Sequence, residues 1–250
     1  MSIMFSFNER TRTLQSSLPI GFKEIMIDSG GFQLQTGSSD KFHITLGGYC
    51  MWLQMILPRH PEVVAYMNLD MPNDPEKSLA NLLYMESQGL HPLPIWGIKT
   101  GEHYLDYYCS NYEYVAIGGM VRGGIDIVKK TIEWVSDKYP KNRFHFLGMG
   151  VTSFQVFRSA KPYSVDCSTW TDPVRFGHTT VNLGSLDEDG VHLGRKGGLR
   201  VRLLPLEVRN NIRTDRKFAR EMLLENIHVI KQMEDMIEEI PQESWQRRLL

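Results

Sequence analysis

The chain has 250 residues, of which 42% are hydrophobic, and a formal net charge of -1. This length and composition exclude a disordered or fibrous protein and supply enough apolar side chains for one large domain or two small ones. A charge so close to neutral excludes attraction of the whole molecule to a polyanion, so any nucleic-acid surface must be local.

The cysteine and histidine patterns indicate a reduced protein without a metal. Cys50, Cys109 and Cys167 are widely separated and odd in number, which argues against a disulfide framework. No CxxC, HxH or HExxH pattern occurs, so we expect no metal and no other cofactor, with a metal held by ligands from distant positions as the open alternative. The N-terminal apolar stretch is interrupted too soon by charge for a signal peptide, and no apolar run reaches the roughly 20 residues of a membrane span. We therefore expect a cytoplasmic protein.

Short apolar, β-branched runs that end in a polar residue or a glycine predict buried strands. In chain order the predicted strands are Glu24–Asp28, Val63–Asp70, Pro92–Gly97, Tyr114–Gly118, Arg143–Gly148 and Tyr163–Asp166.

Helical periodicity between these strands predicts helices over Glu76–Gln88 and Ile125–Lys138. Pro75 and Gly89 mark the start and stop of the first helix. We expect its buried face to carry Leu79, Leu82, Leu83 and Glu86. For the second helix the expected buried residues are Ile125, Val128, Ile132 and Val135.

The alternation of strands and helices predicts an α/β protein with a parallel sheet. A length of 250 residues suits a (β/α)8 TIM-type barrel, and no GxGxxG or GxxxxGK[ST] turn favours an open sheet. We expect such a barrel, whether regular, irregular or incomplete, as a single domain over residues 1–250.

The C-terminal part of the chain separates its charges. Arg195–Arg220 contains nine Lys and Arg against two Asp and Glu, whereas Glu221–Glu243 contains seven acids and one lysine. Apolar spacing predicts a long helix over about Asp215–Glu239, so residues 195–240 form a basic segment and a helical extension within the domain. The stripe expected to be buried is Phe218, Met222, Leu223, Ile227, Ile230, Met233 and Ile237.

Three aspartates end predicted strands, and in a barrel these ends converge on one mouth. They are Asp28, Asp70 and Asp166. An aspartate after a strand is also a common helix cap, so the neighbouring residues must decide between a structural and a functional role. Asp28 is followed by Ser-Gly-Gly-Phe-Gln and Asp166 by Cys-Ser-Thr-Trp. Paired glycines let a ligand approach the backbone, which favours a binding site.

Four ordered segments resemble the tRNA-guanine transglycosylase superfamily. Residues 27–33 look like its DSGG[FY]Q motif, and residues 115–120 look like its A-[VI]-G-G-L segment. Residues 147–150 and 164–167 match its M-G-V-G and F-D-C stretches in order and spacing.

Two segments resemble more closely the deazapurine DNA transglycosylases of phages and bacteria. One is Asn68–Ser78 with Asn81 and Gly89 downstream, and the other is residues 164–170, which end in Ser-Thr-Trp. The CxCxxC zinc site of the tRNA enzymes is absent, so we expect no zinc subdomain. Thr100 stands near the position of the family's base-reading glutamine.

The resemblance implies exchange of guanine in DNA for a 7-deazaguanine such as 7-cyano-7-deazaguanine. It makes Asp166 the nucleophile that holds the sugar covalently and Asp28 the acid and base, as in retaining glycoside hydrolysis. The target nucleotide must leave the duplex stack or already be single-stranded. The implied base-binding residues are Asp70, Ser29, Gly30, Phe32, Gln33, Gly118, Gly119 and Met120. For Phe32, Met120 and Trp170, simple core filling is the alternative.

The basic segment is the predicted phosphate contact, with a solvated helical face as the alternative. Its predicted nucleic-acid-binding residues are Arg195, Lys196, Arg200, Arg202, Arg209, Arg213, Arg216 and Lys217. Two other functions stay open: base exchange in tRNA, and a non-catalytic nucleic-acid-binding paralogue. A metal-dependent barrel hydrolase would need clustered histidines that the sequence lacks. The oligomeric state is left open.

Overall fold

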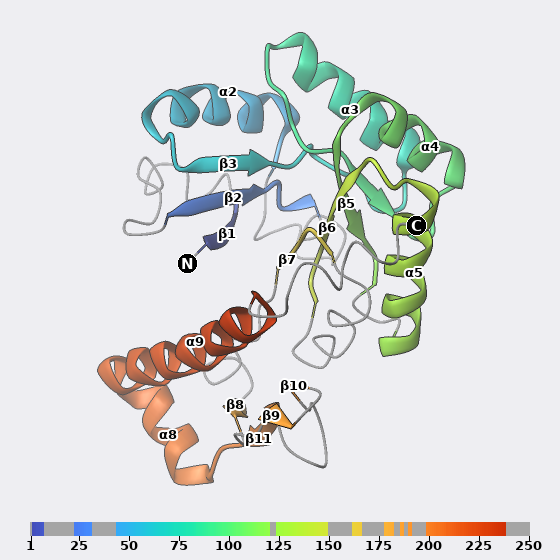
Figure 1. The fold of residues 1–250 in the computed structure, drawn as a ribbon. Coiled ribbons are helices and arrows are strands. Elements are labelled where there is room, and N and C mark those ends of the chain that lie inside the picture. The colour runs from blue at the N-terminus through green and yellow to red at the C-terminus, as the bar shows by residue number, and fades with distance from the viewer. Residues whose placement is uncertain are drawn as a thin grey trace. The chain divides into compact units, whose positions relative to one another are not determined.

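The computed structural model shows a mixed α/β protein with parallel sheets (Figure 1). It describes residues 2–7, 23–31, 44–120, 124–149, 162–166, 178–182, 186–187, 190–191 and 199–238. The chain divides into two compact units, each of which is described separately below. Unit 1 comprises Met1–Arg122 and Val135–Leu147, and unit 2 comprises Gly123–Trp134 and Gly148–Leu250.

Six strands of unit 1 run parallel and neighbour one another in chain order. β1 (Ser2–Ser6), β2 (Glu24–Asp28) and β3 (Val63–Tyr66) form one sheet. β4 (Ile95–Gly97), β5 (Tyr114–Gly118) and β6 (Arg143–Phe146) follow in another. A parallel bridge between Met67 and Leu93 joins β3 to β4. This order without reversal agrees with the predicted βαβ units, and closure into a barrel stays a prediction.

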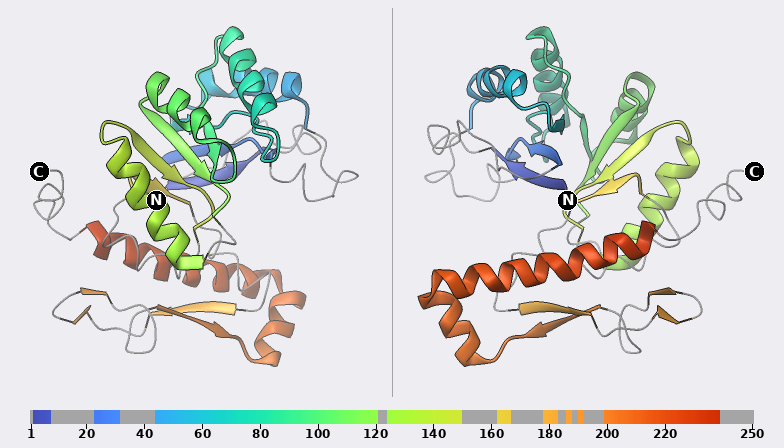
Figure 2. Two further views of the ribbon diagram at one scale, coloured as in Figure 1. Left: turned by 90° about the vertical axis from the view of Figure 1, so that its right-hand side faces the viewer. Right: turned by 60° about the vertical axis from the view of Figure 1, so that its left-hand side comes forward.

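One helix separates each of the strands from β2 to β6. α2 (Leu46–Ile56) continues into the 3-10 turn η2 (Leu57–Arg59), and α3 (Pro75–Ser87), α4 (Glu102–Asn111) and α5 (Gly124–Lys138) follow in turn. Helices α2, α3 and α4 lie on the same side of the strands in all views (Figures 1 and 2). The side chains on the other face of these strands therefore point away from these helices.

The two faces of the sheet carry different residues, as strand alternation requires. Ile25 and Ile27 of β2 belong to the apolar cluster that also contains Tyr49 and Trp52 of α2. The alternate residue Met26 packs instead against a second cluster, which consists of Met67, Leu93, Ile95 and Ala116 with Met4, Met26, Tyr114 and Leu147 at its edge. Asp28 is two residues beyond Met26 and so shares the face turned away from the helices.

Strand β3 contains an irregularity against β2. Ile25 pairs with Val63, but the next residue Met26 pairs with Ala65, so Val64 has no partner in the register. Val64 is 58% exposed, whereas Val63 and Tyr66 both pack on the helix-facing cluster although they are three residues apart. The extra residue is a β-bulge that changes which face the rest of β3 presents.

The buried face of α3 differs from the predicted one. Leu82 is buried as expected, but Leu83 is 46% exposed, and Leu79 and Glu86 are only partly buried. The other buried residues are Ser78, Asn81 and Met85. A prediction from the spacing of hydrophobic residues misses this face because two of its residues, Ser78 and Asn81, are polar. In α5 the expected Val128, Ile132 and Val135 are buried, and the Ile125 side chain lies outside the described residues.

Unit 2 contains a short strand and a hairpin followed by two helices. β7 is Ser164–Val165; β8 (His178–Asn182) pairs antiparallel with β11 (Leu199–Leu203), and β9 (Leu186–Asp187) with β10 (Gly190–Val191). α8 (Leu206–Thr214) packs on α9 (Arg216–Glu238), which also contacts β8.

The bounds of α9 confirm the predicted long helix within one residue, while α8 was not predicted. Of its expected stripe, Phe218, Met222, Leu223 and Ile227 are half-buried. The side chains of Ile230, Met233 and Ile237 lie outside the described residues. Among the helices that the structure describes, none combines the length and apolar character needed to cross a membrane.

Candidate functional site

Asp28 lies at the carboxyl end of β2 and is fixed by the neighbouring strand β1. The Ser6 hydroxyl donates to Asp28 Oδ2 at 2.7 Å, and the Phe7 backbone N–H donates to the Asp28 carbonyl at 2.9 Å. Ser6 and Met4 alternate with Phe7 along β1, so Ser6 reaches the same face as Asp28. One carboxylate oxygen is thereby oriented by a hydroxyl on the face turned away from the helices.

The turn after Asp28 brings a second aspartate close. Ser29 is fully buried, its hydroxyl donates to Asp70 Oδ1 at 3.4 Å, and it accepts from the Gly31 N–H at 3.2 Å. Gly30 has a φ of 78°, a conformation that favours glycine. A side-chain carbon on Gly31 would collide with both the carbonyl oxygen and Oδ1 of Asp70. The paired glycines predicted to admit a ligand therefore also admit Asp70.

The environment of Asp70 favours its protonated form. Its pKa is raised from the ordinary value of 3.8 to about 7. Burial is the main cause and the negative charge of Asp28 adds to it, while the hydrogen bond from Ser29 acts in the opposite direction. The carboxyl groups of Asp28 and Asp70 are therefore close enough to interact electrostatically. Near neutral pH this pair holds a proton that an exposed pair of aspartates would lose.

A buried polar network holds the loop that carries Asp70, and its members come from the segment after β3, from α3 and from β4. Asn81 Nδ2 donates to the Leu69 carbonyl at 2.8 Å, and the Ser78 hydroxyl accepts from the Met71 N–H at 2.7 Å. Asn68 Nδ2 donates to the Ser78 carbonyl at 3.2 Å, and its Oδ1 accepts from the Ile95 N–H at 2.9 Å. Asn68, Ser78 and Asn81 belong to a segment that resembles the DNA transglycosylases, but the resemblance implies no role for them.

The start of α3 extends this support. Asp74 caps the helix by accepting from the Lys77 N–H at 2.9 Å, and Pro75 occupies the first turn. The Asp74 N–H donates to the Met71 carbonyl at 2.7 Å. The loop from Asp70 to Asp74 is thus a tight turn joined directly to a capped helix.

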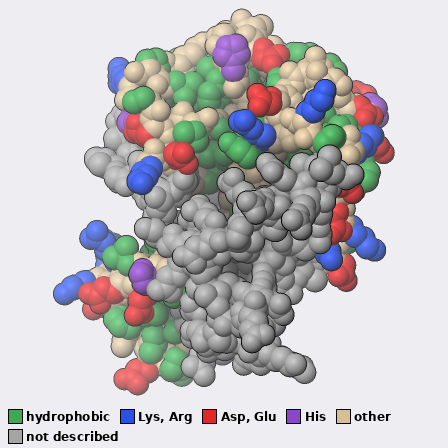
Figure 3. All heavy atoms as spheres, in the orientation of Figure 1, with side chains coloured by type: hydrophobic (Ala, Val, Ile, Leu, Met, Phe, Trp, Pro, Cys, Tyr) green, Lys and Arg blue, Asp and Glu red, His purple; other side chains and the backbone are tan. Residues whose placement is uncertain are grey.

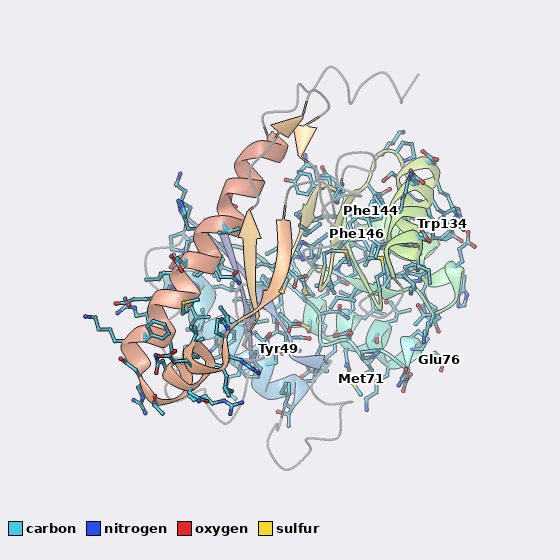
Figure 4. The ribbon with its side chains drawn as sticks, turned by 90° about the horizontal axis from the view of Figure 1, so that it is seen from below. Tyr49, Met71, Glu76, Trp134, Phe144 and Phe146 are labelled. Carbon is cyan, nitrogen blue, oxygen red and sulfur yellow. The ribbon has the colours of Figure 1, made fainter. Side chains whose placement is uncertain are left out.

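Tyr49 of α2, labelled in Figure 4, interacts electrostatically with both aspartates. Its ring is fully buried, and its hydroxyl donates to the Met67 carbonyl at 2.9 Å. Burial raises the pKa of Tyr49 well above its usual range, and the charges of Asp28 and Asp70 contribute to the increase. Tyr49 therefore stays a neutral hydrogen-bond donor that fixes the end of β3.

The predicted base-binding glycines lie at the end of β5, next to the end of β4. The Ile98 N–H donates to the Gly118 carbonyl at 3.1 Å, and Gly119 has a φ of 88°. Met120 is only 1% exposed, so its side chain is covered in this structure. Thr100, which the sequence resemblance places near a base-reading glutamine, donates its hydroxyl to the Gly97 carbonyl at 2.7 Å. The Thr100 hydroxyl therefore stabilises the turn from Gly97 to Thr100.

Asp166, the predicted nucleophile, follows β7 in unit 2. Its Oδ1 accepts from the Gly148 N–H at 2.7 Å, and its carbonyl accepts from the Met149 N–H at 2.9 Å. Gly148 has a φ of 67°, which a glycine adopts without strain. The structure thus brings together the two family-like segments at residues 147–150 and 164–167, which the sequence separates.

The predicted phosphate-contacting residues of α8 and α9 are accessible. Arg213, Arg216 and Lys217 are exposed, and Arg209 is partly buried. Basic and acidic side chains lie interspersed over these two helices (Figure 3). Arg200 and Arg202 lie on β11, with side chains outside the described residues. The predicted residues Phe32, Gln33, Trp170, Arg195 and Lys196 also lie outside the described residues.

The aspartates do not form a metal site in the part of the chain that the structure describes, where no group of three or more His, Cys, Asp or Glu residues is suited to hold an ion. No model of a known protein family matches the chain, and no curated protein matches it. The chemistry must therefore be argued from the site itself. Two interacting carboxyl groups, one of them with a raised pKa, are suited to proton transfer and to hydrogen bonding with a purine edge.

Proposed function

We propose that this chain is a base-exchange transglycosylase that replaces guanine in DNA by a 7-deazaguanine. The observation that carries the proposal is the meeting of Asp28 and Asp70 at the ends of neighbouring parallel strands, in an environment that raises the pKa of Asp70 to about 7. Active sites are where proteins arrange such carboxyl pairs, because acid–base work near neutral pH needs them. Both aspartates also occupy the motifs that resemble the transglycosylases.

In the proposed reaction Asp166 supplies the nucleophilic oxygen. Its carboxylate attacks C1′ of the deoxyribose, the bond between C1′ and the guanine ring nitrogen breaks, and the electron pair leaves with the base. Asp28 passes to the departing base the proton that the Asp28–Asp70 pair holds near neutral pH. The incoming 7-deazaguanine returns a proton to Asp28, and its ring nitrogen attacks C1′ and displaces Asp166. Charge and protons balance over the cycle, and no cofactor enters it.

Asp70 would read the base rather than react with it. Its carboxyl group would hydrogen-bond to the purine amino and ring N–H groups, while the backbone near Gly118 and Gly119 offers further polar groups. The sequential parallel order of β1 to β6 supports the barrel that this chemistry assumes, because strand ends then share one mouth.

DNA is the proposed polymer because the described part of the basic segment presents exposed cations on α8 and α9. Such side chains neutralise phosphates without reading sequence. The absence of CxCxxC in the sequence also favours DNA over tRNA, since the tRNA enzymes carry a zinc site there. The target nucleotide would be flipped out of the duplex or bound as a single strand.

The deciding experiment follows labelled guanine and 7-cyano-7-deazaguanine into nucleic acid. We expect incorporation into DNA, detected by mass spectrometry of its nucleosides, and none into tRNA. Incorporation only into tRNA would replace the proposed substrate, and incorporation into neither would refute base exchange. A denaturing gel should also show a covalent protein–DNA adduct with the wild-type protein and none with Asp166→Ala.

A further inference from the structure

Three buried polar residues around the Asp70 loop have no part in the chemistry proposed above. They are Asn68, which follows β3, and Ser78 and Asn81 of α3, and we call them the loop clamp. Their exposed fractions are 0%, 4% and 8%, respectively, and each makes a hydrogen bond to a backbone group. Two of these residues bond directly to the neighbours of Asp70, namely Leu69 and Met71. The clamp therefore holds the Asp70 loop on both sides.

Stability alone does not explain buried polar residues at these positions. A hydrogen bond to a buried group contributes little beyond what a well-packed apolar side chain contributes, whereas loss of one partner leaves a polar atom unsatisfied. Met85 and Leu82 show that the same face of α3 accepts apolar side chains. The hydrogen bonds of the clamp instead select one conformation of the loop, because only that conformation satisfies all of them.

The selected conformation disfavours the ionised form of the Asp70 carboxyl group. It places the carboxyl group against the Gly31 backbone, within reach of the Ser29 hydroxyl and in the field of Asp28. Tyr49 from α2 and Tyr108 from α4 also interact electrostatically with Asp70. Burial beside a like charge disfavours a carboxylate, so a loop without the clamp would turn Asp70 toward water.

We propose that Asn68, Ser78 and Asn81 are positioning residues that hold the Asp70 carboxyl group beside that of Asp28. The use of this arrangement in base binding rests on the proposed function, whereas the positioning itself does not. The clamp acts through the backbone on either side of Asp70 and touches neither the base nor the reacting atoms.

A matched pair of variants tests the clamp at Ser78. Ser78→Thr and Ser78→Val have the same shape, but only threonine keeps the hydroxyl that accepts from Met71. The readout is the titration of the Asp70 carboxyl carbon by NMR. We expect a midpoint of about 7 in the wild type and in Ser78→Thr. In Ser78→Val we expect the midpoint to fall by about one pH unit or more. Equal midpoints in the two variants would overturn the proposal.

A second variant guards against a general loss of folding. Asn81→Leu keeps the size of the side chain and removes the donor to the Leu69 carbonyl, so we expect the same downward shift of the Asp70 midpoint. Leu82→Val is the control, since it weakens packing on the same face of α3 and should leave the midpoint unchanged. An equal shift in Leu82→Val would show that ordinary loosening of α3 explains the result, and would also overturn the proposal.

Activity provides a separate readout of the same variants. We expect kcat/KM for base exchange to fall about tenfold or more in Ser78→Val, with a displaced pH profile, and to recover largely in Ser78→Thr. If the wild-type protein exchanges no base, the proposed function fails, while the NMR titration still tests the clamp. If exchange occurs and the titrations of Ser78→Thr and Ser78→Val agree, only the clamp fails.

Discussion

The Asp28–Asp70 region of unit 1 and the basic surface of α8 and α9 in unit 2 are built in opposite ways. In unit 1 two acidic groups are partly enclosed, and hydroxyls and backbone N–H groups of Ser6, Ser29 and Gly31 fix the geometry around them. On α8 and α9, Arg213, Arg216 and Lys217 are exposed to solvent. The first arrangement suits chemistry, which depends on atomic positions, and the second suits a polyanion, which responds to charge density. The two regions should therefore respond to different perturbations.

The largest effect should come from Asp166→Asn, which separates chemistry from DNA binding. The amide cannot act as the nucleophile, so we expect base exchange to fall by at least about 1000-fold. DNA affinity, measured by fluorescence anisotropy, should stay within about twofold because the basic surface is untouched. Exchange that persists above about a tenth of the wild-type rate would remove Asp166 from the proposed role.

Asp70→Asn tests the enclosed region through stability. The folded-state pKa of about 7 exceeds the ordinary 3.8, so the folded protein holds the proton more tightly than the unfolded chain does. This contribution is complete below about pH 4 and is lost as the pH rises through about 7. We expect the wild-type free energy of unfolding to decline over this window relative to Asp70→Asn, by on the order of 2–4 kcal/mol.

Urea unfolding at a series of pH values measures this difference. Asp126→Asn, which removes an exposed acid from α5, is the matched control and should follow the wild-type curve. Parallel curves for Asp70→Asn and the wild type would show that Asp70 is not perturbed in the folded protein.

Neutralising Arg213, Arg216 and Lys217 to alanine tests the exposed region. Each lost phosphate contact should lower the slope of log affinity against log salt by about 0.9, so we expect the slope to fall by about 2 to 3. The control removes three exposed lysines elsewhere, Lys77, Lys130 and Lys141, for the same change in net charge. A salt response equal to that of the wild type in the α8–α9 variant would assign the DNA contact to other residues.

The smallest expected effect comes from adding one methyl group to the enclosed region. Gly31→Ala forces a carbon against Asp70, and we expect a loss of about 1–3 kcal/mol in unfolding free energy. Gly47→Ala is a matched control on α2, because a side-chain carbon there meets no atom within 4 Å. We expect that variant to be unchanged or more stable by about 0.5–1 kcal/mol. Equal melting curves for the two variants would contradict the close approach of Asp70.

Much of the local structure of unit 1 follows from its sequence. The bounds of β2 and β5 agree residue for residue with prediction, since a charged residue or a glycine ends each apolar run. β4 begins later than predicted, at Ile95, because Pro92 and Pro94 lack the N–H that a ladder needs. The convergence of Asp28 and Asp70 was predicted from strand ends, and their electrostatic interaction agrees with it.

Other features depend on tertiary contacts that no local pattern reveals. The burial of Ser78 and Asn81 is favourable only because backbone groups of the Asp70 loop lie opposite them. Leu83 is exposed because the buried face of α3 is the one that carries Ser78, Asn81, Leu82 and Met85. The helix α8 was missed because its nine residues include only one buried apolar side chain, Ile212.

The extra residue Val64 absorbs one residue of chain length in β3. Because β3 uses one more residue than β2 does at this point, Tyr66 rather than Ala65 pairs with Ile27. Deleting Val64 should restore regular pairing while Ala65 and Tyr66 keep their partners and their faces. Deleting a residue after Val64 should instead turn the side chains between that residue and Asp70 to the other face, so the strand tolerates a change of length at one position only, six residues before Asp70.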